Sequence, residues 1–329
     1  MMKTTKIFLS ILFLTLLITH NSVYSAERIY WIAAEKVAWN YAPARKNLIK
    51  PGAGMGVWGK KLIYRKYRYI QYTDSNFNKV IKAPESMGIL GPQIRAVEGD
   101  TIKVHFYNKT DKPLSMHPHG VSYEKKSEGA DSSGKGAEVR PGEKYTYHWQ
   151  ADADSAPGAN DPSSIVWLYH SHVDPVKESY DGLIGTIIIT KKGYQRSDQD
   201  PRPKDIDVEF TTLFMVFNEN KANAKIQREG ELKHSINGYI FGNLKGLTAT
   251  KGQKIRWYLV AMGTETDMHT AHWHGKTVVE NGRRTDVVEL LPASMKTVDM
   301  VANNPGSWLY HCHVNDHITA GMSARWQVK

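Results

Sequence analysis

The chain contains two versions of one set of motifs, in the same order. Each version starts with a glycine-led, strand-like segment, continues with a His-x-His-Gly motif and a Trp-Leu-Tyr-His-x-His motif, and ends with glycine followed by Leu or Met. Such self-similarity predicts two homologous domains. A polar stretch rich in proline and charge, residues 191–205, separates the two sets. We place the predicted boundary inside it, which gives domains at residues 26–195 and 196–329.

Short alternating segments predict a chain made mostly of β-strands. In residues 99–108, Ile102, Val104 and Phe106 alternate with polar side chains, as expected for a strand with one buried face. Residues 252–262 occupy the corresponding place in the second half. Turn residues recur between such segments and no long stretch keeps a helical period. We therefore expect an all-β fold of two antiparallel β-sandwich domains.

Residues 1–25 have the composition of a signal peptide. Lys3 and Lys6 precede an apolar run, Ile7–Ile18, that is short for a membrane span, and small residues follow it. We expect an exported protein, periplasmic or secreted, without a stable membrane anchor. The formal net charge is +10 at pH 7. The basic residues are scattered along the chain, which favours a solvated surface over a nucleic-acid partner.

Eight of the 14 histidines form four His-x-His pairs, two in each half. Alternate residues of a strand point to the same face, so each pair can direct two imidazoles at one point. Four pairs at equivalent places in two repeats predict a metal site, although imidazole alone does not distinguish copper, zinc, iron and nickel. The pairs are His117/His119, His170/His172, His272/His274 and His311/His313.

The second half adds residues that narrow the choice of metal. His269, Cys312, His317 and Met322 supply two imidazoles, a thiolate and a thioether, which is the ligand set of blue-copper electron-transfer sites. Cys312 is the only cysteine, so the chain cannot form an internal disulfide. We expect one blue-copper site, in the second domain, because the first half lacks all four ligands. The residues at the matching positions are Leu114, Ser171, Val176 and Leu183.

With these motifs the chain resembles the multicopper oxidases, in particular two-domain forms such as the small laccases and the first and last domains of ceruloplasmin and hephaestin. Segments such as "HPHGVSYEKKSEGA", "INGYIFGNLKGLT" and "LYHCHVNDHITAGM" carry the resemblance. It implies two cupredoxin-like Greek-key domains and four copper ions per chain, classed as type 1, type 2 and a type 3 pair. The implied ligands are His269, Cys312, His317 and Met322 for type 1, His117 and His272 for type 2, and His119, His170, His172, His274, His311 and His313 for type 3.

The resemblance also implies an activity, in which one-electron oxidation of a small donor is coupled to the reduction of O2 to water. The donor would be a phenol, Fe(II) or another metal ion. Glu128 and Tyr123 match positions beside the oxygen-reducing coppers of related proteins, as sources of protons and of an electron. Glu219 in "FNEN" and Asp316 beside His317 match carboxylates of an iron-oxidation site. Related proteins build the copper cluster between two domains, so a homotrimer with clusters between subunits is expected.

Two other classes of protein remain open on the sequence. A copper nitrite reductase also forms trimers of two-domain chains, but its pattern has type 1 ligands in the first domain and lacks the complete set of eight cluster histidines. A simple electron-transfer protein would explain the blue-copper set and leave the His-x-His pairs unused. Metal content separates them, because the oxidase predicts about four coppers per chain, the reductase about two and the electron-transfer protein about one.

Overall fold

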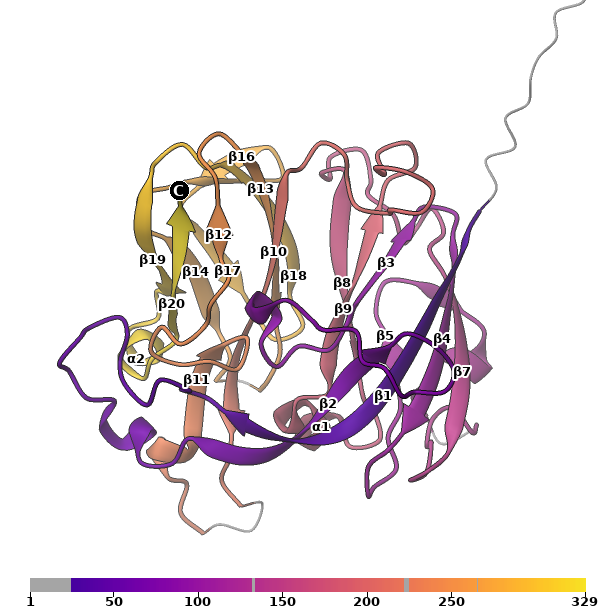
Figure 1. Ribbon diagram of the computed structural model, residues 1–329, viewed down its shortest axis with the longest axis horizontal. Coiled ribbons are helices and arrows are strands. Elements are labelled where there is room, and N and C mark those ends of the chain that lie inside the picture. The colour runs from indigo at the N-terminus through magenta and orange to yellow at the C-terminus, as the bar shows by residue number, and fades with distance from the viewer. Residues whose placement is uncertain (1–24, 132–133, 222–224, 265) are drawn as a thin grey trace, which may run out of the picture.

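The computed structural model describes residues 25–131, 134–221, 225–264 and 266–329. The predicted signal peptide therefore lies outside the described residues, apart from Ser25. Regular structure in the described ranges is almost entirely β-strand, which confirms the expected all-β fold (Figure 1). Within these ranges, no helix is long and apolar enough to cross a membrane.

The first half of the chain folds into two sheets packed face to face. One has the strand order β2-β1-β4-β7-β6 and the other the order β3-β9-β8-β5. Ile32, Val104, Trp149 and Ile187 lie in the core between them. The elements are β1 (Glu27–Asn40), η1 (Gly56–Gly59), β2 (Ile63–Tyr72), η2 (Glu85–Met87), β3 (Gln93–Val97), β4 (Thr101–Asn108), β5 (His117–Pro118), β6 (Ser122–Tyr123), η3 (Lys125–Ser127), β7 (Lys144–Gln150), β8 (Ser164–His170), α1 (Pro175–Asp181) and β9 (Ile184–Thr190).

The second half repeats this arrangement with a six-stranded and a five-stranded sheet. Their strand orders are β11-β10-β13-β18-β15-β16 and β12-β20-β19-β14-β17. The elements are β10 (Val208–Asn218), η4 (Glu229–Glu231), β11 (Leu232–Ile236), β12 (Thr248–Ala249), β13 (Lys254–Ala261), β14 (His269–Trp273), β15 (Val278–Glu280), β16 (Arg283–Thr285), β17 (Val287–Leu290), β18 (Met295–Val301), β19 (Gly306–Cys312), α2 (Asn315–Thr319) and β20 (Ser323–Val328).

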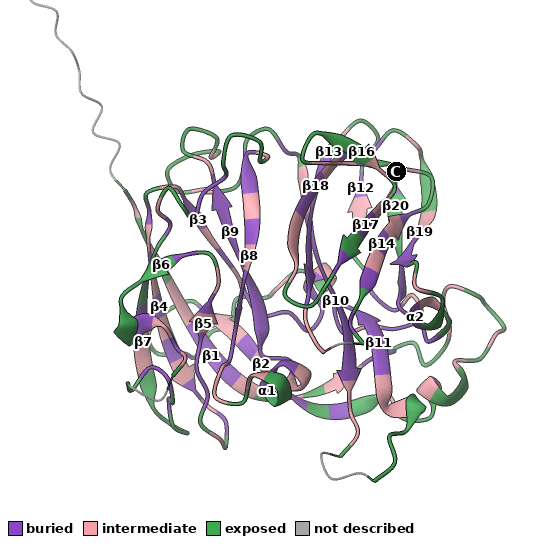
Figure 2. Cartoon of the chain, turned by 180° about the vertical axis from the view of Figure 1, so that it is seen from behind, coloured by how far each residue is buried: buried purple, intermediate pink, exposed green. Residues whose placement is uncertain are grey.

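The two sandwiches pack against each other through the sheet with β8 and β9 and the sheet with β10 and β13 (Figure 2). In β9, Ile187 faces the core of the first sandwich, whereas Ile188 faces the core between the sandwiches. In β13, Leu259 and Val260 divide in the same way. Strands buried on both faces read as continuous apolar runs rather than alternating ones. The described residues therefore form four sheets in sequence, with two inner sheets buried on both sides.

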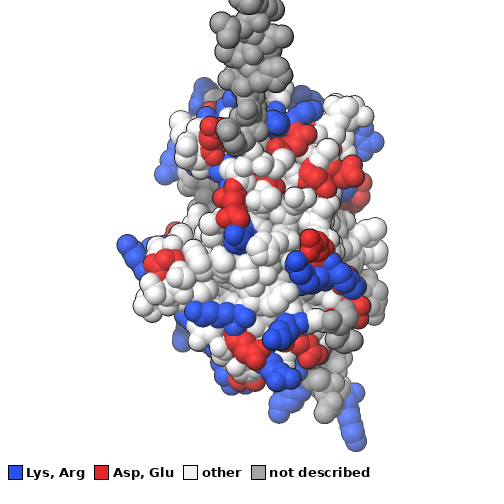
Figure 3. Space-filling view, turned by 90° about the vertical axis from the view of Figure 1, so that its right-hand side faces the viewer, with Lys and Arg blue, Asp and Glu red and all other residues white. Residues whose placement is uncertain are grey.

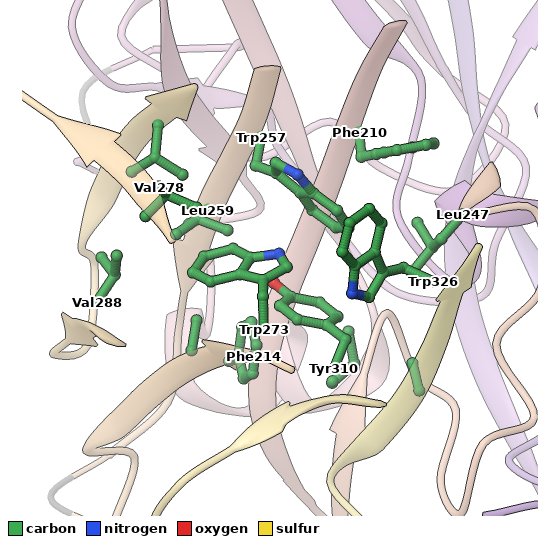
Figure 4. Packing of buried hydrophobic residues seen from close by; sticks show 14 of the residues in the cluster. Phe210, Phe214, Leu247, Trp257, Leu259, Trp273, Val278, Val288, Tyr310 and Trp326 are labelled. Carbon is green, nitrogen blue, oxygen red and sulfur yellow. The ribbon is translucent and has the colours of Figure 1, made fainter. Parts of the chain in front are cut away.

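Large aromatic rings fill the core of the second sandwich (Figure 4). The ring of Trp257 lies 5.6 Å from that of Trp273 and 4.9 Å from that of Tyr310. Complete burial of one large apolar side chain stabilises a fold by about 1.5 to 3 kcal/mol. Tyr310 lies two positions before Cys312 on β19, so this packing also fixes the strand that carries two candidate ligands, His311 and Cys312.

Candidate metal centres

Three side chains of the second sandwich converge on one buried point. His269 begins β14, Cys312 ends β19 and His317 lies in α2. The Nδ1 atoms of the two histidines are 3.1 Å apart, and Cys312 Sγ lies 3.9 Å from His269 Nδ1 and 3.7 Å from His317 Nδ1. Nitrogen and sulfur ligands around one ion, at bond lengths of about 2.0 to 2.3 Å, would lie about 3.5 Å apart. The three atoms therefore fit a single metal ion.

The surroundings of Cys312 favour the thiolate, which is the form that binds metals. Burial by itself raises the pKa of this thiol, but the two histidines and the main-chain N–H of Thr270 lower it to about 6. Met322 is also fully buried. The N–H of Cys312 donates to the carbonyl of Met322 at 3.1 Å, and the N–H of Met322 donates to the carbonyl of His317 at 2.9 Å. The fourth predicted ligand is thus held by the same backbone as the other three.

Asp267 is a neighbour of this site that the sequence motifs do not reveal. Its carboxylate is fully buried and accepts hydrogen bonds from His269 Nε2 at 3.1 Å and from the N–H groups of Val216 and Thr264. Such a contact fixes the ring so that its other nitrogen faces the metal position. Burial lowers the pKa of His269, but the bonds to Asp267 and Cys312 outweigh it and raise the pKa above its usual value. The only sequence signal is the Asp-x-His spacing.

His234, in β11, is a second neighbour that the sequence motifs miss. Its ring centroid lies 4.9 Å from that of His317, and its Nε2 lies 3.6 Å from a carboxylate oxygen of Glu229. Neither ring nitrogen has a hydrogen bond within the described residues. Burial, with repulsion from His317 and His269, lowers the pKa of His234 to about 3. The ring is therefore neutral at physiological pH and can bind a cation.

Four histidines of the second sandwich form a separate cluster. His272 Nδ1 and His274 Nε2 lie 3.2 and 3.1 Å from His311 Nε2, and the ring of His313 is 5.3 Å from that of His272. His311 Nδ1–H donates to the carbonyl of Cys312 at 2.7 Å, which leaves Nε2 free for a metal. Burial lowers the pKa of His311 to about 4, so the ring is a neutral ligand at pH 7.

The first sandwich contains a matching cluster. His119 Nε2 lies 3.1 Å from His170 Nε2, and the ring of His117 is 5.1 Å from that of His172. His170 Nδ1–H donates to the carbonyl of Ser171 at 2.9 Å, as His311 does to Cys312. Burial lowers the pKa of His119 to about 4 and that of His170 to about 3. These rings, too, are neutral at pH 7.

Each pair straddles the end of a strand, which differs from the expectation that both histidines lie within one. The first histidine is in β5, β8, β14 or β19, and the second follows outside the strand. The rings of each pair still lie 5.0 to 5.5 Å apart. Because strands end at the edge of a sandwich, both clusters lie at the surface, where His313 is exposed.

The two clusters do not meet within one chain. Among the described residues, which include all eight histidines, every ring contact between two of these histidines joins members of the same cluster. One cluster lies on β5 and β8 and the other on β14 and β19, and the six-stranded sheet lies between these two sheets (Figures 1 and 2). Each cluster is therefore open to another molecule.

Two predicted residues, Tyr123 and Glu128, lie beside the first cluster. The Tyr123 ring is 6.2 Å from that of His117, and burial raises its pKa. The carbonyl of Glu128 accepts a hydrogen bond from His117 Nδ1 at 2.7 Å, while its carboxylate pairs with Lys125 at 2.5 Å. Glu128 thus orients a candidate ligand through its main chain.

The predicted iron carboxylates, Glu219 and Asp316, occupy different environments. Glu219 is nearly buried, and its carboxylate binds the ammonium of Lys66 and the hydroxyl of Tyr41. Asp316 lies exposed in the first turn of α2, beside His317. The structure therefore leaves Asp316 accessible to a cation, whereas Glu219 already has a cationic partner.

The fold and the candidate sites define a two-domain metalloprotein whose ligands suit copper. It has two β-sandwiches, a buried trio of two imidazoles and a thiolate, and two clusters of neutral imidazoles. The family model for multicopper oxidase matches residues 67–193, and a second one with the same description matches residues 205–329. The chain belongs to the multicopper oxidase family.

Known proteins resemble the chain in sequence and in structure. Hephaestin of Rattus norvegicus is 37% identical over 347 residues, which cover 93% of this chain and 29% of hephaestin. Ceruloplasmin of Homo sapiens is 37% identical over 344 residues, which cover 94% and 31%. The chain thus spans about a third of the length of these relatives. The structure of the multicopper oxidase mgLAC matches with a TM-score of 0.67 at 20% identity, covering 92% of this chain and 87% of that one, and shows the same fold.

Proposed function

We propose that the protein is an oxygen-reducing multicopper oxidase that oxidises Fe(II). In balanced form, four Fe(II), one O2 and four protons give four Fe(III) and two waters. The main support for this proposal is the position of Cys312. It belongs to the buried trio, while its neighbours His311 and His313 belong to the surface cluster. One strand end therefore connects the place where a donor can deliver electrons with the place where O2 can be reduced.

The proposed copper ligands are those implied by the resemblance, and their geometry fits. When bound, type 1 copper accepts single electrons, and the other three coppers supply the four-electron reduction of O2. Within the chain, the hydrogen bond from His311 Nδ1 to the Cys312 carbonyl adds a second short connection to the covalent one. Tyr123 and Glu128 remain proposed as neighbours that supply an electron and a proton, since Tyr123 lies beside His117.

The separation of the two histidine clusters supports a homotrimer. A cluster of eight histidines requires the first sandwich of one chain to meet the second sandwich of another. A head-to-tail contact of this kind closes into a ring when the rotation between copies is suitable, and three copies make the six-domain ring expected from the resemblance. The N-terminal segment 1–25 supports export of the assembled protein or its precursor.

The surroundings of His317 support Fe(II) as the donor. Glu229 and Asp316 offer carboxylate oxygens, and His234 offers a ring nitrogen without a hydrogen bond, next to the type 1 position. Iron(II) accepts both kinds of ligand. A curated relative, Ferroxidase HEPHL1 of Homo sapiens, is 36% identical over 93% of this chain. We propose that Glu229, His234 and Asp316 guide Fe(II) toward the type 1 position; they are not among the described groups of three residues whose ligand atoms lie within 4.8 Å of one another, so they do not form a preformed three-ligand site. Glu219 stays a proposed iron carboxylate, with Lys66 as its present partner.

Oxygen consumption with two donors tests this proposal. The copper-loaded protein should contain about four coppers per chain and oxidise both Fe(II) and a neutral hydroquinone. Glu229→Gln should lower kcat/KM for Fe(II) about tenfold while leaving hydroquinone oxidation unchanged, because the substitution removes one hard oxygen ligand. Glu124→Gln, at an exposed position beside the first cluster, is the matched control. Equal losses for both donors, or no loss with Fe(II), would refute the iron site.

A further inference from the structure

The segment between β1 and β2, residues 41–62, crosses from the first sandwich to the second and is called the strap below. It lies beside α2, the helix that carries His317, in both views of the ribbon (Figures 1 and 2). The N–H of Leu48 donates to the carbonyl of Phe241 at 2.9 Å, and the N–H of Phe241 donates to that of Gly321, next to Met322. The strap is therefore part of the wall around the type 1 position.

A buried lysine of the second sandwich holds the far end of the strap. Lys233 Nζ donates to the carbonyls of Trp58 and Lys61 at 2.9 and 2.8 Å. Burial lowers the pKa of Lys233 to about 8, so it is still largely charged at pH 7. A methyl group added to Gly230 would lie 2.6 Å from the carbonyl oxygen of Val57, which shows how closely the strap packs on η4. The strap is thus a fixed surface.

The strap has a single-sign charge pattern. Its five charged residues are all basic and exposed, and within the described residues only Lys61 has an acidic partner, Glu231 at 3.9 Å. By contrast, acidic and basic side chains are mixed on the end of the molecule seen in Figure 3. Unpaired charges of one sign raise the local concentration of oppositely charged ligands. The five residues are Arg45, Lys46, Lys50, Lys60 and Lys61.

Beside these cations lie the groups proposed to bind iron. Glu229, in η4, has a side chain that is 58% exposed, and η4 packs directly on the strap. Asp316 is exposed on α2. The elements that carry carboxylates for a cation, η4 and α2, therefore adjoin the segment that carries ammonium groups for anions. A metal ion surrounded by its own carboxylate ligands presents both charges at once.

We propose that the strap binds the anionic periphery of a low-molecular-weight Fe(II) polycarboxylate chelate and so delivers iron to Glu229, His234 and Asp316. This inference rests on the proposed function. Copper held by His269, Cys312 and His317 would take one electron from the chelated Fe(II), which would leave as Fe(III) with its chelator; four such electrons and four protons would reduce one O2 to two waters. Interactions of this kind weaken when salt shortens the Debye length, which is about 8 Å at 0.15 M.

The test compares two double charge reversals in the copper-loaded protein. Lys46→Glu with Lys50→Glu alters the strap, and Lys191→Glu with Lys192→Glu makes the same change of net charge in the segment between the domains. At low ionic strength, the strap variant should have a KM for Fe(II) citrate about five to ten times higher, with kcat unchanged. Its KM for a neutral hydroquinone should not move, and added salt should remove the difference between variant and wild type.

Binding of gallium(III) citrate, which is redox-inert, separates the strap from the chemistry. Wild-type protein should bind it by calorimetry, and the strap variant should bind it at least fivefold more weakly. Loss of Fe(II) oxidation with intact, Lys46- and Lys50-dependent gallium citrate binding would overturn the proposed donor and support the strap. An equal rise in KM for the control variant, a similar rise for hydroquinone, or gallium citrate binding unaffected by the strap substitutions would each overturn the inference.

Discussion

The two sandwiches have the same backbone around the type 1 position and different side chains on it. In the second, the N–H of Thr270 donates to Cys312 Sγ at 3.4 Å; in the first, the N–H of Ser115 donates to Ser171 Oγ at 3.0 Å. The carbonyl of Leu183 accepts from Ser171 at 3.2 Å, just as that of Met322 accepts from Cys312. The first sandwich thus keeps the scaffold of the site without its ligands.

The helix after the second pair shows where the scaffolds diverge. His317 is 7% exposed in α2, whereas Val176, at the matching sequence position, is 57% exposed in α1. Leu183 follows Ser171 by 12 positions, and Met322 follows Cys312 by 10. The two extra residues and the start of α1 at Pro175 turn position 176 to solvent. The first domain therefore lacks a type 1 site for two reasons: its four matching side chains are not ligands, and its backbone at the start of α1 differs from that of α2.

The largest expected change in absorption and turnover comes from exchanging the side chains of Cys312 and Ser171. Cys312→Ser should abolish both the visible charge-transfer absorption and turnover with any donor, because no thiolate remains. Ser171→Cys should keep the absorption and turnover that depend on Cys312 and should add no second blue-copper site, because position 176 cannot supply a ligand to it. Absorption spectra and oxygen consumption measure both. A new blue band in Ser171→Cys, or turnover in Cys312→Ser, would contradict the assignment.

A mixing experiment tests whether the two histidine clusters of different chains combine into one copper cluster. His170→Ala disables only the first cluster and His274→Ala only the second, so each homotrimer should be inactive. Co-expressed at equal levels, the variants should recover about a quarter of wild-type activity, because about one interface in four then pairs two intact clusters. A protein in which every chain carries both substitutions should stay inactive. Absence of recovery, with trimers present, would place the complete cluster within a single chain.

The repeats allowed much of this arrangement to be predicted from the sequence. The expected strands at 99–108 and 252–262 correspond to β4 and β13 within two residues. In β4 apolar residues alternate with polar ones because one face is buried, whereas β13 contains a continuous apolar run because both faces are buried. His-x-His spacing predicts which rings meet, since it depends only on local strand geometry. Contacts between distant segments leave no such pattern. His234 comes from another strand, and the pairing of Glu219 with Lys66 crosses from one sandwich to the other.

Asp267 provides a smaller, graded test, because the first sandwich has no carboxylate at the corresponding position. The buried negative charge of Asp267 beside His269 stabilises the more oxidised metal. Asp267→Asn removes this charge, so the type 1 reduction potential should rise by tens of millivolts. A tenfold change in relative affinity for the two oxidation states corresponds to about 59 mV. Redox titration of the visible absorption gives the value. Asp111→Asn, an exposed carboxylate of the first sandwich, should leave the potential unchanged, and equal shifts would refute a local role.

The smallest expected effect concerns acid stability of the copper-free protein. The pKa values of His119, His170 and His311 in the fold are about 4, 3 and 4, below the value of about 6.5 in an unfolded chain. As pH falls below about 6.5, the unfolded chain therefore takes up protons that the folded chain does not, and the free energy of unfolding decreases. Thermal unfolding midpoints should fall between pH 7 and pH 4.5, and His170→Gln should flatten this dependence by about 2 to 4 °C. His311→Gln should flatten it less, because the pKa of His311 is lowered less. A steeper slope in either variant would show that these rings are protonated in the folded protein.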